Sequence, residues 1–383
     1  MAFELVSGSQ AAAIAVQRVG VDLVSAYPIT PQTAIVETLA NFDAKGELGA
    51  DFVSVESEYS ALACCYGAAA GGARVFTATA SHGLAYMHEM IHWLGGARLP
   101  VVMVNVNRSI GAPWCLDPDQ GDSLSQRDTG WMQIYCAGAQ EVFDTVLQAY
   151  LLAEELLLPC MVVFDGFYIS HTYEAVDLPD QEQVRSLIGP PAFKAQVVPG
   201  EPGNIHGIIP GEKQLGLVRL RHQAMLRAPE LFLKINERFA GYFGRQYGIL
   251  EVEIPEGAKR VIVTAGAMSE TVRAVLPELS GTGLIQLRMF RPFPVEQLRK
   301  IVTEKEIEEL LVIDRNCSTG MGGIFAQEVR AALYGIDREP QVHNISLAGG
   351  VDLTPAMLHK IVSQPAPDRK GEAVNAITWG DQL

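Results

Sequence analysis

Polar residues that can do chemistry occur in this 383-residue chain at places where predicted strands end. Four such stretches are Tyr27–Pro31, Glu56–Glu58, Thr77–Leu84 and Asn105–Arg108. A parallel sheet gathers the carboxyl ends of its strands along one edge, and open α/β proteins bind their ligands there. The four stretches together therefore predict a ligand site at one edge of a sheet.

Each candidate side chain also has an ordinary structural explanation. Thr30 before Pro31 is a suitable helix N-cap, with proline at the first helical position. Glu58 would favour a helix N-terminus through the helix dipole. Arg108 could form a surface ion pair with a loop aspartate, and His82 could be only a turn donor. The residues alone leave these alternatives open.

The elements that would position these side chains are predicted by short apolar runs that alternate with helical stretches. The predicted strands are Leu23–Tyr27, Phe52–Val55, Arg74–Thr79, Pro100–Val106 and Cys160–Phe164. The helical stretches are Gln10–Val19, Pro31–Phe42, Ser57–Ala70, Gly83–Leu94 and Val142–Leu156. Nearly continuous apolar strands alternating with helices indicate an α/β fold, with a parallel sheet covered on both faces.

The alternation stops between Asp177 and Pro229, where prolines and turn signals predict a long wrapping connection. A helix-like stretch, Pro229–Phe243, follows it. Apolar runs then resume at 261–266, 284–290 and 309–314, with helices predicted over Ser269–Leu279 and after Pro294. We therefore expect three parts: a first domain over 1–178, a connection with a helix over 179–255, and a smaller α/β domain over 256–383.

Composition excludes several classes of function. The chain has 29 Lys and Arg against 44 Asp and Glu, a net charge of −15, which argues against nucleic-acid binding. The apolar runs are too short to span a bilayer and no signal peptide is visible, so we expect no membrane and a cytoplasmic location. None of the six cysteines forms a CxxC pair, so an iron–sulfur or zinc-ribbon spacing is missing and buried thiols are expected.

One motif suggests a metal. The sequence HEMIH at His88–His92 matches HExxH, which places two imidazoles on one helical face. A third ligand is missing nearby, because Arg98 stands where a metzincin has histidine and the next glutamate is Glu141. Asp117 or Asp119 could substitute. A helix packed on a sheet explains the stretch better, and a zinc hydrolase is kept only as a distant alternative.

Several longer stretches of the sequence resemble those of a known family. They are SAYPITPQTAIVE (25–37), SVESEYSALA (54–63), FTATASHGLAYMHEM (76–90), PVVMVNVNRSIGAPW (100–114), QRDTGWMQIY (126–135), FDGFYISHTYEAVDLPD (164–180) and LRMFRPFPVEQL (287–298). Over nearly the whole chain, these strings resemble the α subunit of 2-oxoacid:ferredoxin oxidoreductases, especially the pyruvate branch. The resemblance implies a thiamine-diphosphate-binding fold, with a pyrimidine-type first domain and a second domain similar to the C-terminal domain of transketolases.

The resemblance also implies roles for individual residues. Glu58 matches the glutamate that activates the cofactor, and Glu56 is its nearby competitor. Arg108 and Thr30 match residues that bind the substrate carboxylate, with Arg127 the next candidate should Arg108 be structural. The expected cofactor-binding residues are Pro28, Ile29, Glu58, Ser81 and His82. Because Thr30, Glu58 and Arg108 are all retained, a non-catalytic scaffold is disfavoured.

A site divided between chains is implied as well. The partner half of such a site carries a GDG motif that holds the metal, whereas this chain has Gly121-Asp122-Ser123. Mg²⁺ and [4Fe-4S] clusters are therefore expected in partner subunits: a β subunit with the diphosphate half-site, and γ and ferredoxin-like δ subunits. The implied reaction is oxidative decarboxylation of a 2-oxoacid with coenzyme A to acyl-CoA and CO₂, with electrons passing to ferredoxin.

The sequence does not decide which 2-oxoacid is the substrate. Pyruvate is expected from the resemblance, and a branched or aromatic 2-oxoacid, such as 2-oxoisovalerate or phenylglyoxylate, is the alternative. Bulky Trp114 and Leu116 in the loop after Arg108 could shape the substrate pocket, but their orientation is not given by the sequence.

Overall fold

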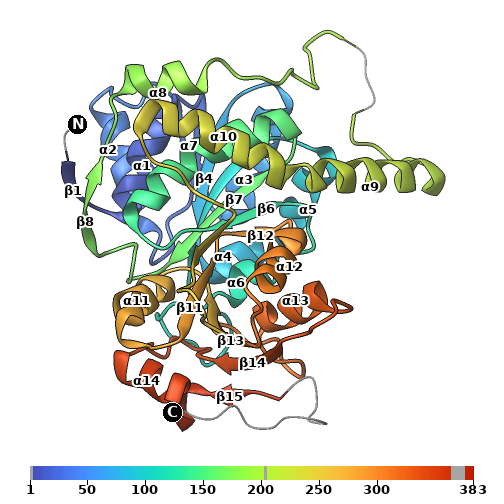
Figure 1. Ribbon diagram of the computed structural model, residues 1–383. Coiled ribbons are helices and arrows are strands. Elements are labelled where there is room, and N and C mark those ends of the chain that lie inside the picture. Colours follow the sequence, from blue (N-terminus) through green and yellow to red (C-terminus); the bar gives the residue numbers. More distant parts are fainter. Residues whose placement is uncertain (1–2, 202–204, 364–375) are drawn as a thin grey trace.

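A seven-stranded sheet is the centre of the first part of the chain (Figure 1). The computed structural model describes residues 3–201, 205–363 and 376–383. The sheet contains β2 (Leu23–Ala26), β3 (Asp51–Ser54), β4 (Val75–Thr79), β5 (Val102–Asn107), β6 (Met132–Tyr135), β7 (Cys160–Asp165) and β12 (Met289–Arg291). Its order is β12-β6-β7-β5-β4-β2-β3, and every pair is parallel except β12 with β6. The predicted parallel sheet is confirmed.

Helices cover both faces of this sheet, as the continuous apolar strands predict. Along β5, Val102 packs in one core and its neighbour Met103 packs in the other, because successive side chains point to opposite faces. The first core lies under α1 (Gly8–Val19), α7 (Ala139–Leu156) and α10 (Ala228–Phe243). The second lies under α3 (Glu58–Ala70) and α5 (His88–Ala97), and it continues into the second domain.

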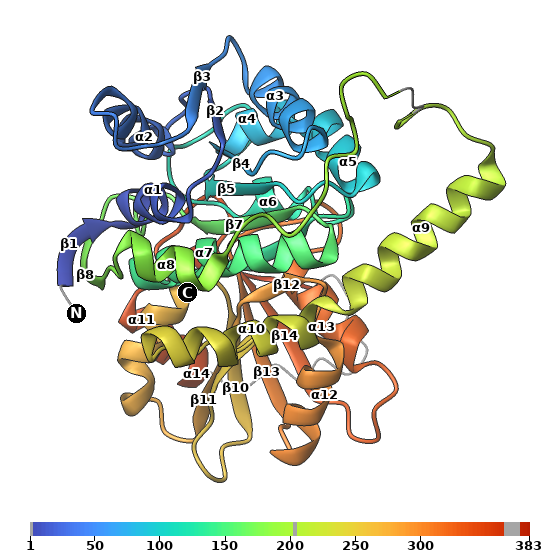
Figure 2. The same cartoon turned by 90° about the horizontal axis from the view of Figure 1, so that it is seen from above.

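The second domain is built on a six-stranded sheet (Figure 2). Its order is β15-β14-β13-β10-β11-β9. The strands are β9 (Leu250–Glu253), β10 (Arg260–Thr264), β11 (Thr282–Leu287), β13 (Glu309–Asp314), β14 (Gln341–Ser346) and β15 (Thr378–Trp379). The helices are α11 (Met268–Val275), η1 (Leu276–Glu278), α12 (Val295–Glu304), α13 (Ile324–Leu333), α14 (Pro355–Ser363) and η2 (Gly380–Gln382).

Several elements differ from the sequence prediction. The predicted helix Gly83–Leu94 is two helices, α4 (Ser81–Tyr86) and α5, which meet at Met87. The predicted strand at 284–290 is also divided, because β11 ends in the second sheet and β12 joins the first. The sequence did not predict several short elements. These are the strands β1 (Phe3–Ser7) and β8 (Tyr173–Asp177), which form a separate antiparallel pair, the strand β6, and the helix α6 (Gly121–Leu124).

The connection contains more helix than predicted. Besides α10 it carries α8 (Gln181–Ile188) and α9 (Gly211–Leu226). Figure 2 shows α9 projecting from the body of the molecule. The division at 178/179 and 255/256 remains our proposal, since β9 and β12 each join a sheet formed mainly by other parts of the chain.

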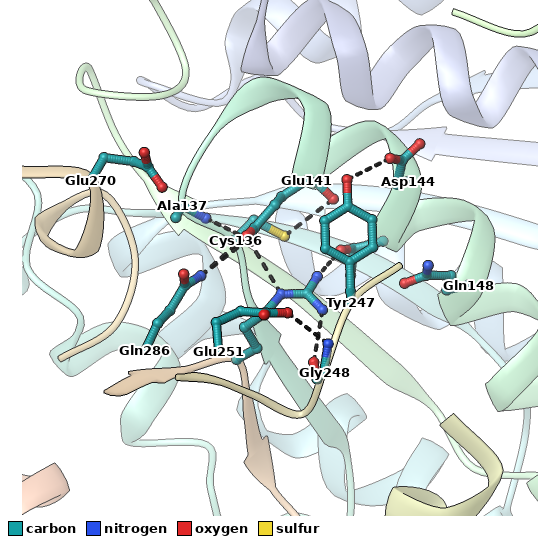
Figure 3. Close-up of polar contacts among 12 residues, drawn as sticks. Cys136, Ala137, Glu141, Asp144, Gln148, Tyr247, Gly248, Glu251, Glu270 and Gln286 are labelled. Atoms are coloured by element: carbon teal, nitrogen blue, oxygen red, sulfur yellow. Dashed lines mark hydrogen bonds and ion pairs between the residues drawn. The ribbon is translucent and has the colours of Figure 1, made fainter. Parts of the chain in front are cut away.

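Arg288 ties the two sheets together where the chain passes from β11 to β12. Its guanidinium is fully buried and donates to Glu141 at 3.4 Å, to the Gly248 carbonyl at 3.0 Å and to the Thr145 hydroxyl at 2.9 Å. Figure 3 shows Glu141, Gln286 and Gly248 converging from three segments of the chain. A buried charge with this many partners fixes the junction of the two domains.

The cysteine prediction is only half right. Cys65, Cys136 and Cys160 are buried, whereas Cys64, Cys115 and Cys317 are partly exposed. The partly exposed thiols lie on helix and loop surfaces rather than in strands. Among the described helices, none combines the length and the apolar character that crossing a bilayer requires.

Candidate active site

The predicted ligand edge is formed by the adjacent strands β3, β2, β4 and β5. Because these strands are parallel, the segments that follow them emerge side by side. Thr30, Glu58, His82 and Arg108 each lie on one of these segments. The structure therefore gathers the four polar stretches at one edge, as the sequence pattern predicts.

Glu58 and Glu56 are clearly distinguished by their surroundings. Glu58 is the first residue of α3 and is 8% exposed, and the neighbouring N-cap Ser57 accepts a hydrogen bond from the Ser60 amide at 3.2 Å. Glu56 is exposed and bonds the Ser60 hydroxyl, which lowers the pKa of the Glu56 carboxyl. Of the two glutamates, only Glu58 is buried at the ligand edge.

Gly83 is essential to the position of Glu58. A Cβ atom at Gly83 would lie 2.7 Å from Glu58 Oε1 and 2.6 Å from Thr79 Oγ1. Real Cβ atoms essentially never come this close to another heavy atom, so any side chain here would displace the carboxylate. In the sequence, Gly83 is only the first residue of a predicted helix, because a close approach between two elements leaves no local signal.

Arg108 directly follows β5 and is 5% exposed. Its Nη1 donates to the Thr30 carbonyl at 2.5 Å, and its Nη2 lies 3.2 Å from His82 Nδ1. Burial lowers the pKa of the Arg108 guanidinium, while the carboxylates of Asp122 and Glu58 act in the opposite direction. The buried Nε has no hydrogen-bond partner among the described residues.

His82 and Trp114 complete the surroundings of Arg108. The backbone N–H of Gly111 donates to His82 Nε2 at 3.2 Å. The Trp114 ring lies 4.8 Å from the Arg108 guanidinium carbon and 5.9 Å from the centroid of the His82 ring. His82 is therefore more than a turn donor, and Trp114 faces the arginine although half of its surface is exposed.

Thr30 is not a helix cap, so that alternative is wrong. The helix α2 (Thr33–Ala44) begins three residues later, and its N-cap residue is Gln32. Thr30 instead gives its carbonyl to Arg108 and has an exposed side chain at the edge. Pro28 is exposed and Ile29 is half-buried beside it.

Asp122 is a residue that the sequence analysis missed. It is fully buried, and its Oδ2 accepts hydrogen bonds from the Ser81 amide at 2.9 Å, the Asn105 side chain at 3.1 Å and the Arg108 amide at 3.2 Å. Burial raises the pKa of the Asp122 carboxyl to about 7, although these hydrogen bonds act against the shift. Its partners lie in segments that are distant in the chain, so no local sequence pattern marks this aspartate.

The other candidates lie elsewhere. His88 and His92 on α5 meet edge to face with ring centroids 4.8 Å apart, and His88 Nδ1 lies 2.6 Å from Gln126 Oε1. The described part of the chain holds no group of three or more His, Cys, Asp or Glu placed to bind a metal ion. Arg127 pairs with its neighbour Asp128 at 3.8 Å.

The arrangement at the edge suits an anionic ligand next to a proton acceptor. Arg108 offers an unpaired buried nitrogen, and Thr79 Oγ1 beside Glu58 is likewise buried without a partner among the described residues. A guanidinium recognises a carboxylate through its fork of donors. Glu58, close to this guanidinium, can accept or hold a proton.

Comparisons with known proteins agree with this arrangement. Residues 14–236 match the family model described as pyruvate flavodoxin/ferredoxin oxidoreductase, thiamine-diphosphate-binding, and residues 258–358 match pyruvate:ferredoxin oxidoreductase core domain II. The chain is 39% identical to pyruvate synthase subunit PorA of Methanothermobacter thermautotrophicus, covering 99% of this chain and 98% of the relative. It is 41% identical to ketoisovalerate oxidoreductase subunit VorA of Pyrococcus horikoshii, covering 92% and 90%.

Solved structures show the same fold. The 2-oxoglutarate:ferredoxin oxidoreductase from Magnetococcus marinus superimposes with a TM-score of 0.73 at 20% identity, covering 94% of this chain and 65% of that chain. A split-gene transketolase superimposes with a TM-score of 0.53 at 14% identity, covering 93% of each chain. The expected thiamine-diphosphate-binding α/β fold is thereby confirmed.

Proposed function

This chain belongs to the 2-oxoacid:ferredoxin oxidoreductase family, as an α subunit, and from that premise we propose that it supplies one half of a thiamine-diphosphate site. A partner subunit would close the site over the edge that carries Glu58 and Arg108. The observation that carries the proposal is the joint placement of a buried carboxylate and a buried guanidinium with an unpaired Nε.

The residues at the edge fit the cofactor. The absence of a side chain at Gly83 lets Glu58 sit against α4, where its carboxylate can bond a ring nitrogen. Pro28, Ile29, Ser81 and His82 flank this position on the neighbouring loops. Thiamine diphosphate, when bound, supplies the electron sink for decarboxylation of a 2-oxoacid. Glu58 would accept a hydrogen bond from the pyrimidine ring and so control its protonation.

Substrate binding is assigned to Arg108 and Thr30. The Arg108 guanidinium would donate to the carboxylate of the 2-oxoacid and hold it until CO₂ departs, while the Thr30 hydroxyl adds a neutral hydrogen bond. The stacked Trp114 ring would restrict the space beside the guanidinium. Pyruvate is the first candidate, and a branched 2-oxoacid is the second, because pyruvate synthase and ketoisovalerate oxidoreductase relatives are similarly close.

Other subunits would supply the remaining functions. We place Mg²⁺ and the diphosphate half-site in a β subunit, and [4Fe-4S] clusters in a ferredoxin-like δ subunit that acts with a γ subunit. Coenzyme A would take the acyl group, and ferredoxin would take the electrons. The relatives named as subunits support an assembly of several chains.

Arg108→Lys in the assembled complex tests this function. Lysine keeps the charge but loses the fork, so we expect KM for the 2-oxoacid to rise by about 10²-fold if one charge-assisted bond is lost. Arg127→Lys is the matched control, since Arg127 pairs with Asp128 at the surface, and its KM should not change. Turnover of pyruvate and of 2-oxoisovalerate by the wild-type complex separates the two substrate candidates. An unchanged KM in Arg108→Lys, with lower thermal stability, would make Arg108 structural.

A further inference from the structure

Asp122 lies beneath the loops that carry the proposed substrate-binding residues. Its Oδ2 is the common acceptor of N–H groups from Ser81, Asn105 and Arg108, which belong to the segments after β4 and at the end of β5. Its Oδ1 accepts from the Ser123 amide at 2.7 Å. One carboxylate therefore joins three parts of the chain that meet at the ligand edge.

The contact with Ser81 fixes an unfavourable backbone conformation. Ser81 has φ of 50°, in the left-handed region that residues with a Cβ rarely adopt. Such a conformation persists only where the surroundings determine it. Asp122 holds the Ser81 amide, and the Ser81 hydroxyl donates to the Ser109 carbonyl. Because His82 follows directly, these bonds also set where the imidazole meets Arg108.

We infer that Asp122 is the positioning residue for substrate binding: by holding the amides of Ser81 and Arg108 it aims the Arg108 guanidinium at the 2-oxoacid carboxylate. The inference rests on the proposed function, in which Arg108 binds that carboxylate. Asp122 itself is fully buried and would act only through the residues it holds.

Two substitutions at one position separate positioning from charge. Asp122→Ala removes the acceptor of four N–H groups, and we expect KM for the 2-oxoacid to rise by about 10- to 100-fold. Asp122→Asn keeps an oxygen in the Oδ2 position and loses only the acceptor of the Ser123 amide, so KM should stay within about threefold of the wild-type value. KM for coenzyme A should stay the same in both variants.

Asp314→Ala is the matched control. Asp314 is also fully buried, and it accepts hydrogen bonds from the amides of Phe325 and Ala326 and from the side chains of Asn316 and Asn344. Both alanine variants should therefore lower the melting temperature, but only Asp122→Ala should change KM. If both variants lose stability and neither changes KM, Asp122 is structural and the inference is wrong.

The pH dependence of KM gives a second readout, usable even if Asp122→Ala does not fold. With the pKa of Asp122 near 7, the wild-type side chain becomes neutral on acidification, as the amide of Asp122→Asn is at every pH. The ratio of the variant KM to the wild-type KM should therefore fall from about threefold at pH 8 to one at pH 6. His82 on α4, Arg108, Glu58 and Tyr135 on β6 also lie around this position, but they are present in both proteins. A ratio that does not change with pH would contradict the inference.

Failure of this inference and failure of the proposed function have different outcomes. If Arg108→Lys leaves KM unchanged, the proposed substrate site is wrong. If Arg108→Lys raises KM while Asp122→Ala does not, the substrate site stands and only the role of Asp122 is wrong.

Discussion

The ligand edge of the first sheet and the corresponding edge of the second sheet, each at the carboxyl ends of the strands, are built from the same kinds of groups. Each edge has a fully buried aspartate, Asp122 or Asp314, whose pKa burial raises to about 7. Each also has a buried arginine directly after a strand, Arg108 or Arg315, with an aromatic ring 4.8 Å from its guanidinium carbon.

The edges differ in what surrounds these groups. Asp314 accepts only from its own domain, where it and two asparagines bind the first amides of α13. Arg315 is directed toward carboxylates of the first domain, since Asp165, Asp119 and Asp117 all raise its pKa against the effect of burial. At the first edge, Glu58 lies close to Arg108, and the exposed Thr30 and Trp114 contact the arginine. A raised pKa therefore does not by itself identify a functional site here.

The largest expected effect comes from removing the charge of Glu58, the carboxylate at the first edge. Glu58→Gln should lower turnover of the assembled complex by about 10²- to 10⁴-fold, because the amide cannot hold the proton that the carboxylate controls. Glu56→Gln is the control, and as an exposed change it should stay within about twofold. Exchange of the cofactor C2 proton, followed by NMR in the complex, measures the step directly. A Glu58→Gln complex with wild-type exchange would move this role to Glu56 or to a partner chain.

Glu58 also illustrates how much of the site the sequence could predict. The apolar runs located β2, β3, β4 and β5, and their parallel order then placed Glu58, Arg108, His82 and Thr30 together. The resemblance supplied their roles, which remain predictions. Whether Glu56 or Glu58 faces the edge depends on where α3 begins, and the structure resolves this choice by placing Glu58 as its first residue and burying it.

Asp314, at the edge of the second sheet, should make the free energy of unfolding depend on pH. The folded-state pKa of Asp314 is raised from 3.8 to about 7, so the folded state binds a proton more tightly than the unfolded state. The contribution of Asp314 to the free energy of unfolding should therefore fall by up to about 4 kcal/mol as the pH rises from 4 to 7. In urea unfolding, the stability advantage of the wild type over Asp314→Asn should shrink over this range. A constant difference would show that Asp314 stays ionised.

The third prediction uses a glycine at each edge. A Cβ at Gly83 would meet Glu58 Oε1 at 2.7 Å, and one at Gly323 would meet Asp314 Oδ2 at 2.1 Å. Each Gly→Ala change should cost about 1–3 kcal/mol through overpacking. For Gly83→Ala we expect the cost mainly in turnover, because Glu58 moves, and for Gly323→Ala mainly in the melting temperature. Equal losses of turnover in the two variants would show that the second edge also contributes to catalysis.

Gly83 and Asp122 also show what the sequence could not reveal. Both act through contacts between segments that are distant in the chain: Gly83 with Glu58, and Asp122 with Ser81. A local pattern identifies strands, helices and caps, but it contains no information about which loop approaches which. The same limit applies to β6 and β12, which pair although more than 150 residues separate them. The sequence did not predict β6, and it predicted β12 as the end of the strand that contains β11.

The smallest expected effect compares the aromatic rings over the two arginines. A cation–π contact contributes about 0.5–2 kcal/mol, so Trp114→Leu should raise KM for the 2-oxoacid by about 2- to 30-fold. Tyr168→Leu removes the corresponding contact with Arg315 and should leave KM unchanged, with a small loss of melting temperature. Because Trp114 lies over the guanidinium, its removal should also widen the space beside the substrate, and KM for 2-oxoisovalerate should rise less than KM for pyruvate. Equal changes for the two substrates would mean that Trp114 supports Arg108 without shaping the pocket. A change of KM in Tyr168→Leu would mean that the second edge reaches the substrate through Arg315, and the distinction between the two edges would then fail.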